Sequence, residues 1–263
     1  MISRRHFGLL ALGMGLTYSL PVAAADLELI NPGKLLVATQ GVFAPFSFKR
    51  PDGELDGLEI RVVREIARRL GLEYTPVITQ FDAALVGLLA GQYDMTSVSR
   101  DITPARQKQV MFADGWLASG AAILTRKDTG IRTGADLKGK NVGAVAASTF
   151  GKIAEDNGAV LKSYKAEVDG VQDLINGNLD AVITDAVAAS YAIKARKLPL
   201  VLGDGTLSQI QKGFAIRKDK PNLVRAINKA LADMIEDGTY GKLTTELIGS
   251  DPHPKEPIRS QLD

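Results

Sequence analysis

The feature that most constrains the fold of this chain is its regular alternation of short apolar runs with amphipathic segments. Apolar runs lie at residues 35–39 and 74–78, and between them residues 58–70 carry apolar side chains three and four positions apart. This spacing predicts a helix, and Gly71 is a typical residue to end it. Strands that alternate with helices need crossover connections, so the pattern predicts a mainly parallel sheet with helices on its faces.

The alternation continues for most of the chain, which predicts a second series of strands and helices. The further predicted strands lie at 121–124, 141–146, 181–184 and 213–216, and the further predicted helices at 81–89, 150–156, 171–175, 187–195 and 222–236. Without its first 25 residues the 263-residue chain keeps 238, enough to bury one large core or two modest ones. We therefore expect an α/β protein.

The N-terminus is typical of an export signal. Arg4 and Arg5 precede an uncharged run from Phe7 to Leu20, and small residues then lead up to Ala25. This predicts a signal peptide over residues 1–25, cleaved near Ala25, since the run is short for a membrane span. The arginine pair also resembles a twin-arginine signal, so both export routes stay open. We expect a soluble protein of the periplasm.

The composition argues against several classes of function. The chain has no cysteine and two histidines, and neither a metal-ligand cluster nor a phosphate-binding glycine pattern is visible, so we expect no metal and no cofactor. Removing Arg4 and Arg5 from the 32 basic residues leaves 30, which equals the 30 acidic residues. A balanced charge gives no electrostatic case for binding nucleic acid or a membrane surface.

Residues 97–106 are a candidate anion site. Thr103 stands where a helix N-cap belongs, and proline follows at the first helical position, which puts Arg106 in the first turn. An arginine there opposes the helix dipole, so helix stability alone does not favour it. A small carboxylate bound by Arg106, by free backbone N–H groups and by the hydroxyls of Ser99 and Thr103 explains it. The alternative is an arginine that pairs with a surface acid or points into water.

Two other segments place polar groups between a strand and a helix. Ser148 and Thr149 follow the apolar run at 141–146, and Asp185 follows the run at 181–184. Each is also a common N-cap, so capping alone explains each of them. Together, however, Arg106 with the two hydroxyls suits a carboxylate and Asp185 suits an ammonium. In open α/β sheets, ligands bind at these carboxyl ends of strands.

Short motifs in a fixed order carry a family resemblance that covers residues 33–248. They are Phe43–Phe46, Gly53–Ile60, Gly91–Asp94, Ile102–Arg106, Leu137–Gly143, Leu179–Asp185 and Gly238–Tyr240. With this set the chain resembles the bacterial extracellular solute-binding proteins of family 3, the periplasmic components of polar amino-acid ABC importers.

The resemblance implies a periplasmic-binding-protein fold of type II, with two α/β lobes joined by two hinge strands. Residues 26–118 with 213–263 would form lobe 1, and residues 122–208 would form lobe 2. A free L-amino acid would be trapped between the lobes by hinge closure and delivered to the permease subunits in the inner membrane. The protein itself would be a monomer and not an enzyme.

The resemblance also implies a role for each site residue. Arg106 would bind the α-carboxylate of the ligand, and Asp185 would bind its α-ammonium. The others implied are Ser148 and Thr149 beside the carboxylate, the backbone of Ser99 beside the ammonium, and Phe43 and Phe81 against the side chain.

Three residues depart from the family pattern. Asp101 replaces a serine or threonine, and we expect it either to point at the ammonium or to pair with Arg100. Ala147 replaces a frequent glycine, which restricts the backbone. Gln40 replaces the aspartate of many cation binders, so we expect it to contact the side chain of the ligand and to favour an uncharged one.

Two other functions fit the same resemblance. Exported cyclohexadienyl (prephenate or arogenate) dehydratases are similar to these binders, and Asp101 or Glu59 could supply the general acid that their reaction needs. A sensor that feeds a chemoreceptor would bind the same ligand and dock on a signalling protein. The sequence does not separate sensing from transport.

Overall fold

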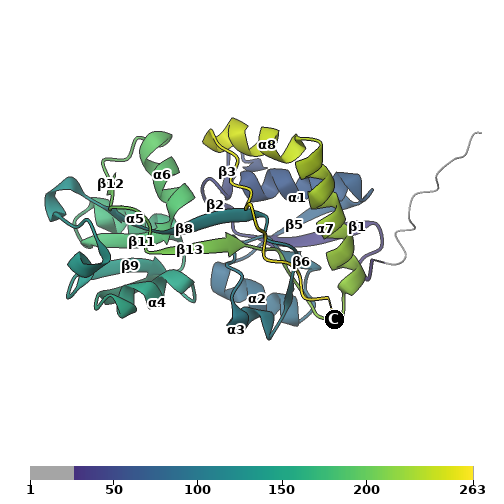
Figure 1. The fold of residues 1–263 in the computed structure, drawn as a ribbon, viewed down its shortest axis with the longest axis horizontal. Helices are drawn as coiled ribbons and strands as arrows, with labels where there is room; N and C mark the ends of the chain where they lie inside the picture. Colours follow the sequence, from purple (N-terminus) through teal and green to yellow (C-terminus); the bar gives the residue numbers. More distant parts are fainter. Residues whose placement is uncertain (1–26, 263) are drawn as a thin grey trace, which may run out of the picture.

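The computed structural model describes residues 27–262, which form two α/β lobes side by side (Figure 1). The predicted signal peptide lies outside the described residues. No helix within residues 27–262 is long and apolar enough to cross a membrane.

The first lobe is built on a five-stranded sheet in the order β5-β1-β6-β14-β7. The central strand β1 pairs in parallel with β5 and β6, and the short β14 pairs antiparallel with β6 and β7. The strands are β1 Lys34–Thr39, β5 Glu73–Ile78, β6 Met95–Thr96, β7 Met111–Phe112 and β14 Ala215–Ile216, with a small separate sheet of β2 Val42–Phe43, β3 Ser47–Lys49 and β4 Leu55–Asp56. The parallel pairs agree with the predicted crossover topology.

The second lobe is built on a sheet in the order β10-β9-β11-β8-β12, with β13 also paired to β8. The strands are β8 Leu117–Thr125, β9 Asn141–Val145, β10 Val160–Tyr164, β11 Ala181–Asp185, β12 Val201–Leu202 and β13 Ser208–Lys212. Successive side chains of β11 enter different cores, because Val182 packs on one face of the sheet and Ile183 on the other. The sheet is therefore covered on both faces.

Within residues 27–262, eight α-helices cover these sheets. They are α1 Leu58–Arg69, α2 Phe81–Leu89, α3 Pro104–Gln107, α4 Thr149–Asp156, α5 Glu167–Ile175, α6 Ala186–Lys194, α7 Pro221–Glu236 and α8 Thr239–Ile248, with 3₁₀ turns at Lys127–Thr129 and Gly134–Leu137. The predicted helices at 58–70, 81–89 and 222–236 are confirmed to within one residue as α1, α2 and α7. The strands β10 and β13 and the helix α8 were not predicted.

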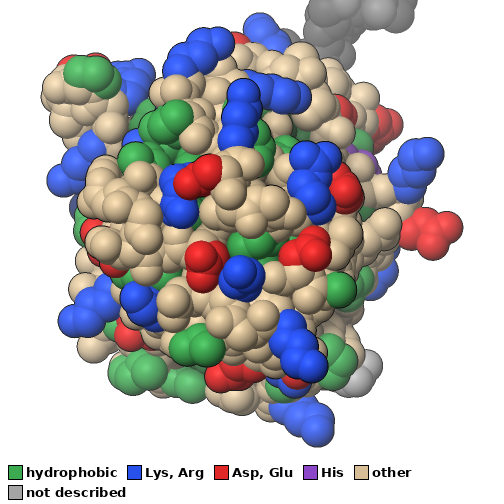
Figure 2. Space-filling view, turned by 90° about the vertical axis from the view of Figure 1, so that its left-hand side faces the viewer, with side chains coloured by type: hydrophobic (Ala, Val, Ile, Leu, Met, Phe, Trp, Pro, Cys, Tyr) green, Lys and Arg blue, Asp and Glu red, His purple; other side chains and the backbone are tan. Residues whose placement is uncertain are grey.

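Strands β8 and β13 connect the lobes and lie side by side between them (Figure 1). They pair antiparallel from Leu117 opposite Lys212 to Ala121 opposite Ser208. The four internal lobe bounds given by the resemblance, 118, 122, 208 and 213, lie in or next to this pair of strands. These bounds remain a prediction. The exposed end of the second lobe carries interspersed basic and acidic side chains (Figure 2).

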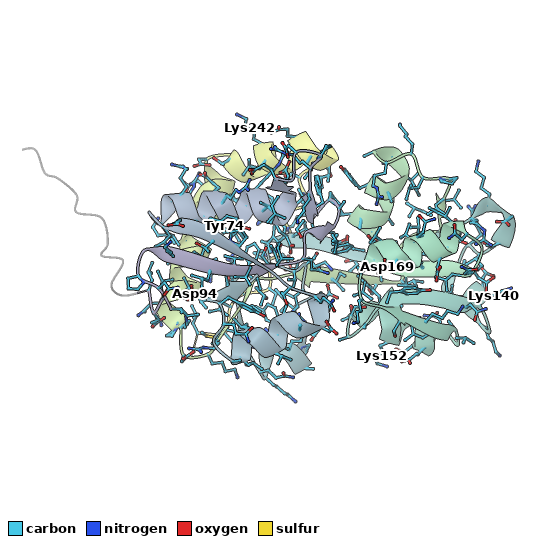
Figure 3. All side chains as sticks on the ribbon, turned by 180° about the vertical axis from the view of Figure 1, so that it is seen from behind. Tyr74, Asp94, Lys140, Lys152, Asp169 and Lys242 are labelled. Carbon is cyan, nitrogen blue, oxygen red and sulfur yellow. The ribbon has the colours of Figure 1, made fainter. Side chains whose placement is uncertain are left out.

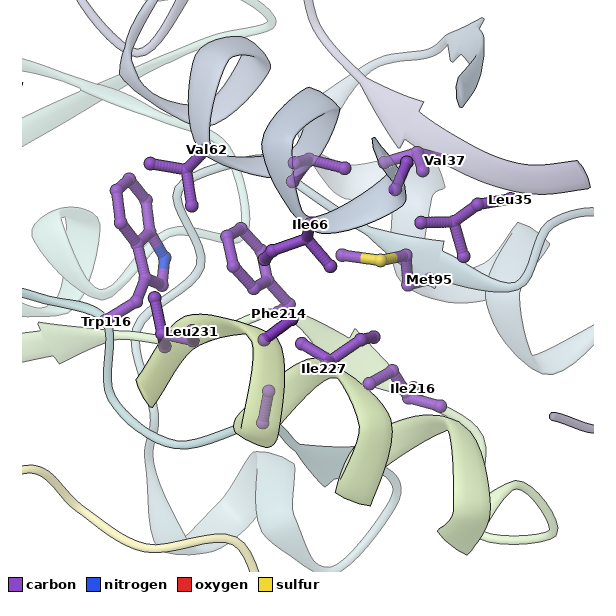
Figure 4. Close-up of a cluster of buried hydrophobic side chains, with 14 of the residues drawn as sticks. Leu35, Val37, Val62, Ile66, Met95, Trp116, Phe214, Ile216, Ile227 and Leu231 are labelled. Atoms are coloured by element: carbon purple, nitrogen blue, oxygen red, sulfur yellow. The ribbon is translucent and has the colours of Figure 1, made fainter. Parts of the chain in front are cut away.

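The core of the first lobe lies between its sheet and the helices α1 and α7 (Figure 4). At the end nearest the connecting strands, the ring of Trp116 stacks on Phe214 with 5.2 Å between centroids. The Tyr240 ring meets Trp116 edge-on, and its hydroxyl donates to the Trp116 carbonyl oxygen at 2.6 Å. This aromatic group anchors the beginning of β8 to the first lobe.

The C-terminal segment after α8 crosses the connecting strands (Figure 1). The backbone N–H groups of Ala118 and Gly115 donate to the carbonyl oxygens of Pro252 and Ile258, each at 2.8 Å. Asp114 accepts hydrogen bonds from the backbone N–H of Ser260 and from Arg259. The proline-rich tail is thus bound to the segment that leads into β8.

A buried ion pair fastens α7 to the sheet. The carboxylate of Asp94 accepts from the Lys220 ammonium at 2.7 Å and from the backbone N–H groups of Ile30 and Leu36 at 2.9 and 3.0 Å. Asp94 lies in the first lobe, away from the second lobe (Figure 3), and both charged side chains are almost fully buried. Removing one partner would leave the other charge without compensation.

We predict that Lys220→Met lowers the free energy of unfolding by about 3–5 kcal/mol, because it leaves the buried Asp94 carboxylate without its counter-charge. Lys229→Met is the matched control, since Lys229 pairs with Asp233 on the exposed face of the same helix and its loss should cost under about 1 kcal/mol. Urea unfolding of the three proteins measures both values. Equal losses in the two variants would contradict the prediction.

Candidate functional site

A cavity between the two lobes gathers most of the residues predicted for the site. Its walls come from the first lobe (Gln40, Phe43, Phe81, Ser99 and Asp101) and from the second (Val145, Ser148, Phe150, Glu167 and Thr184). Its volume is about 20 Å³, which is room for about one water molecule. The lobes are therefore closed on each other, and the wall groups bond mostly to one another.

Helix N-termini surround this cavity. Phe81 is the first residue of α2, Ser148 is the N-cap of α4, and Asp185 is the N-cap of α6. The two caps follow the carboxyl ends of β9 and β11, as the sequence predicted. Asp185 accepts from the backbone N–H of Val187, whereas the Ser148 hydroxyl donates to the Val145 carbonyl oxygen at 2.6 Å. Backbone donors of both lobes thus lie near one place.

Arg106 joins the two lobes through backbone carbonyls. It lies in α3, and its backbone N–H donates to the hydroxyl of the N-cap Thr103, as predicted. Its guanidinium donates to the carbonyl oxygen of Asp101 at 3.0 Å and, across the cleft, to that of Ala147 at 3.1 Å. No carboxylate of residues 27–262 forms an ion pair with it. The alternative of a surface ion pair is therefore not what the structure shows.

Two residues beside Arg106 adopt a backbone conformation that favours glycine. Ser99 has φ of 53° and Ala147 has φ of 59°. Residues other than glycine rarely adopt this left-handed backbone conformation, and such strained residues cluster at functional sites. The restriction expected at Ala147 is thus real, and the conformation turns its carbonyl oxygen toward Arg106.

A buried lysine that the sequence did not indicate stands between the two lobes. The ammonium of Lys212, on β13, lies 2.5 Å from Asp101 Oδ1 and 3.1 Å from Asp185 Oδ2. Asp185 is fully buried, and its other oxygen accepts from the Ser119 hydroxyl and the Val187 N–H, each at 2.8 Å. Asp185, predicted to bind the ligand ammonium, thus lies beside a cation of the chain, but its buried Oδ2 accepts no hydrogen bond.

The expected pairing of Asp101 with Arg100 is wrong. Asp101 bonds instead to Lys212 and to the hydroxyl of Thr149 across the cleft. Arg100 donates to the Phe81 carbonyl oxygen at 2.7 Å, and its guanidinium lies 4.3 Å from the centroid of that ring. Neighbours in an extended segment point to opposite sides, which separates the two charges.

Two further carboxyl groups lie at the cleft without a close cation. Glu59 accepts from the backbone N–H of Ser99, and Glu167 accepts from the Thr184 hydroxyl at 2.6 Å. Burial raises the pKa of Glu59 to about 8 and that of Glu167 to about 7. Glu59 occupies the apolar face of α1, three and four positions before Val62 and Val63, and this misplaced acid was a usable sequence signal.

Comparison with known proteins gives matches over most of the chain. Residues 35–250 match the family described as bacterial extracellular solute-binding proteins, family 3. The L-cystine-binding protein TcyJ of Escherichia coli is 32% identical over 86% of this chain and 88% of its own length. The histidine-binding periplasmic protein of Salmonella typhimurium is 32% identical over 92% of this chain and 97% of its own.

Solved structures agree with these relatives. An ancestral arginine-binding protein bound to arginine is 35% identical, with a TM-score of 0.78 over 82% of this chain and 99% of its own. An ancestral amino acid-binding protein described as a precursor of cyclohexadienyl dehydratase is 32% identical, with a TM-score of 0.78 over 82% of this chain and 96% of its own. The two-lobed fold is therefore shown.

The raised pKa of Glu59 makes stability depend on pH. Its carboxyl keeps a proton up to about pH 8 in the folded chain but only to about 4.5 in the unfolded chain. Raising the pH from 5 to 8 therefore favours unfolding, by up to about 1.4 kcal/mol per pH unit for one proton. We predict that Glu59→Gln flattens this loss in urea unfolding at several pH values. The exposed Glu236→Gln should not, and parallel curves for wild type and Glu59→Gln would contradict the assignment.

Proposed function

We propose a function for this chain from the family to which it belongs, the bacterial extracellular solute-binding proteins of family 3: it binds a free L-amino acid between its lobes and delivers it to the permease of an ABC importer. Delivery takes place in the periplasm, to which the sequence at residues 1–25 would direct it. The protein acts there as a monomeric carrier and not as an enzyme.

The observation that carries this proposal is the state of Arg106. Its guanidinium reaches both lobes but finds only neutral carbonyl oxygens there. A ligand carboxylate would exchange these for charge-assisted bonds, which are about twice as strong. The hydroxyls of Ser148 and Thr149 and the N-terminus of α4 lie on the facing lobe and would receive the same carboxylate.

Entry of a ligand requires the lobes to part. The closed cavity of about 20 Å³ does not hold an amino acid. The paired strands β8 and β13 join the lobes, so a small change in their backbone would move one lobe relative to the other. The packed rings of Trp116, Phe214 and Tyr240 would keep the beginning of β8 fixed to the first lobe.

The side chain of the ligand is basic. The cleft holds the cations Arg100, Arg106 and Lys212 and the carboxyl groups Asp101, Asp185, Glu59 and Glu167. Once all four carboxyls are ionised, which the raised pKa values of Glu59 and Glu167 place above about pH 8, a ligand with one net positive charge brings the sum to zero. Gln40 stands where many cation binders of the family have an aspartate, and for that reason the sequence favoured a neutral ligand. The structure places another carboxyl group, that of Glu167, in the facing wall of the cleft. The ancestral arginine-binding protein and the histidine-binding protein named above support this class.

A dehydratase is the second candidate function. Glu59 and Glu167 keep protons close to neutral pH, as a general acid must. The related dehydratase precursor is itself described as an amino acid-binding protein, which favours binding. If the purified protein converts prephenate to product, the dehydratase function is correct and the binding function alone is not sufficient.

We predict that Arg106→Ala weakens binding of L-arginine at least a hundredfold. Each hydrogen bond to a charged group contributes about 1.5–3 kcal/mol, and a forked pair makes two. Isothermal calorimetry measures the affinity, and thermal melting checks that the variant is folded. Arg225→Ala, on the exposed face of α7, is the control. Near-normal affinity in Arg106→Ala would remove this residue from the carboxylate site.

We also predict that L-arginine binds at least tenfold more tightly than citrulline, its uncharged analogue. The preference should grow from pH 6 to pH 8, because Glu167 and Glu59 must lose their protons to pair with the guanidinium. Glu167→Gln should remove much of it, whereas the exposed Glu155→Gln should not. Equal binding of the two ligands at pH 8 would overturn the basic class but leave the amino-acid site standing.

A further inference from the structure

The C-terminal tail, residues 251–262, is bonded to both strands that connect the lobes. On β8, the backbone N–H of Ala118 donates to a carbonyl oxygen of the tail at 2.8 Å. On β13, the side-chain amide of Gln211 donates to the carbonyl oxygen of Glu256 and accepts from the backbone N–H of Ile258, each at 2.8 Å. Ala118 and Gln211 also lie opposite each other in the strand pair. The tail therefore holds both strands at the same level.

The tail is anchored on the first lobe. The carboxylate of Asp114 accepts from the backbone N–H of Ser260 at 2.8 Å. The side-chain amide of Asn228, on α7, donates to the Ser260 hydroxyl at 2.8 Å and to Asp114 at 3.1 Å. Within residues 27–262, no hydrogen bond joins the tail to the second lobe beyond the two connecting strands. The tail would therefore move with the first lobe when the lobes part.

Gly115 gives the tail room to reach Gln211. A Cβ atom at Gly115 would lie 2.1 Å from Gln211 Oε1 and 3.3 Å from the backbone nitrogen of Ile258. Non-bonded heavy atoms do not approach as closely as 2.1 Å, so a side chain at this position would displace the Gln211 amide. The backbone N–H of Gly115 also donates to the Ile258 carbonyl oxygen at 2.8 Å. The contact between tail and β13 thus depends on close approach as well as on hydrogen bonds.

The strand pair is free of the tail on the side toward the second lobe. Two positions along each strand from the level held by the tail, Gly120 on β8 lies opposite Gln209 on β13. Glycine adopts the widest range of backbone angles, so a bend costs least at Gly120. The side chain of Gln209 is exposed, and it lies on the same face of the strand as that of Gln211. Hinge bending is therefore expected at Gly120 and Gln209.

We infer that the C-terminal tail limits where the connecting strands bend: it keeps Ala118 and Gln211 with the first lobe and leaves the bend to the level of Gly120. The open form then has fewer arrangements of its two lobes. Such a form loses less conformational entropy when a ligand closes the cleft, so the tail strengthens ligand binding. None of the tail residues belongs to the cavity wall, so this effect reaches the ligand only through the hinge. The inference rests on the proposed function, since it needs a ligand that closes the lobes.

Gln211→Ala tests the inference, because it removes both side-chain bonds between β13 and the tail. Gln209→Ala is the matched control, since it removes the same side chain from the same face of the same strand. The chain has no cysteine, so Lys140→Cys and Lys242→Cys place one spin label on each lobe, at exposed positions labelled in Figure 3. Pulsed electron paramagnetic resonance then measures the distribution of distances between the labels.

In the unliganded protein this distribution should be broader for Gln211→Ala than for wild type and control. With saturating L-arginine the three distributions should coincide, because the closed form is the same in each. A distribution in unliganded Gln211→Ala that is as narrow as in wild type would overturn the inference, whatever the ligand is. Thermal melting checks that each variant is folded.

Calorimetry with L-arginine gives the second readout. Gln211→Ala should bind more weakly than wild type by about threefold or more, since its open form loses more entropy on closure, whereas Gln209→Ala should bind like wild type. Unchanged affinity in Gln211→Ala would show that the tail does not contribute to binding and would overturn the inference. If wild type does not bind L-arginine, the proposed ligand is wrong, and the distance distributions of the unliganded proteins still decide what the tail does.

Gly115→Ala reaches the same contact from the other strand and takes over should Gln211→Ala not fold. Its added methyl group would displace the Gln211 amide from the tail while Gln211 itself remains. The same broadening and the same loss of affinity are expected. Wild-type distance distributions in a folded Gly115→Ala protein would contradict the inference.

Discussion

The closed arrangement of the two lobes places one buried cation between a carboxylate of each lobe. Lys212 binds Asp101 of the first lobe and Asp185 of the second, and Thr149 adds a hydroxyl from the second lobe to Asp101. These groups are buried, so each must find its partner inside the chain. The same requirement explains why Arg106 turns to carbonyl oxygens of both lobes. In the closed cleft these bonds join one wall to the other, while Ser99 Oγ and Asp185 Oδ2 stay without a hydrogen-bond partner.

The fold delivers these groups to one place by a repeated device, a strand that ends at the N-terminus of a helix. Ser148 and Asp185 stand at such junctions, and the irregular backbone at Ser99 and Ala147 adds an N–H and a carbonyl directed into the cleft. The site is thus built on both sheets, and the paired strands β8 and β13 join its two walls.

Sequence periodicity was sufficient where a segment packs along a single face. The helix α1 was predicted in this way, and Arg106 was recognised because its position opposes the helix dipole. Lys212 was not found, because its contact with Asp101 spans 111 residues and β13, with the sequence Ser-Gln-Ile-Gln-Lys, lacks a marked apolar alternation. Glu59 could be predicted only in part. The sequence pattern places it on an apolar helix face, but nothing in the sequence indicates its hydrogen bond with the backbone of Ser99.

The small volume between the lobes has a consequence for recognition by a partner. Because the closed cleft leaves only about 20 Å³, an amino acid can enter only an open form, in which the lobes lie further apart. The outer surfaces of the two lobes are then spaced differently in the two forms. A membrane protein that touches both lobes at once could therefore tell the closed form from the open one without reaching the ligand.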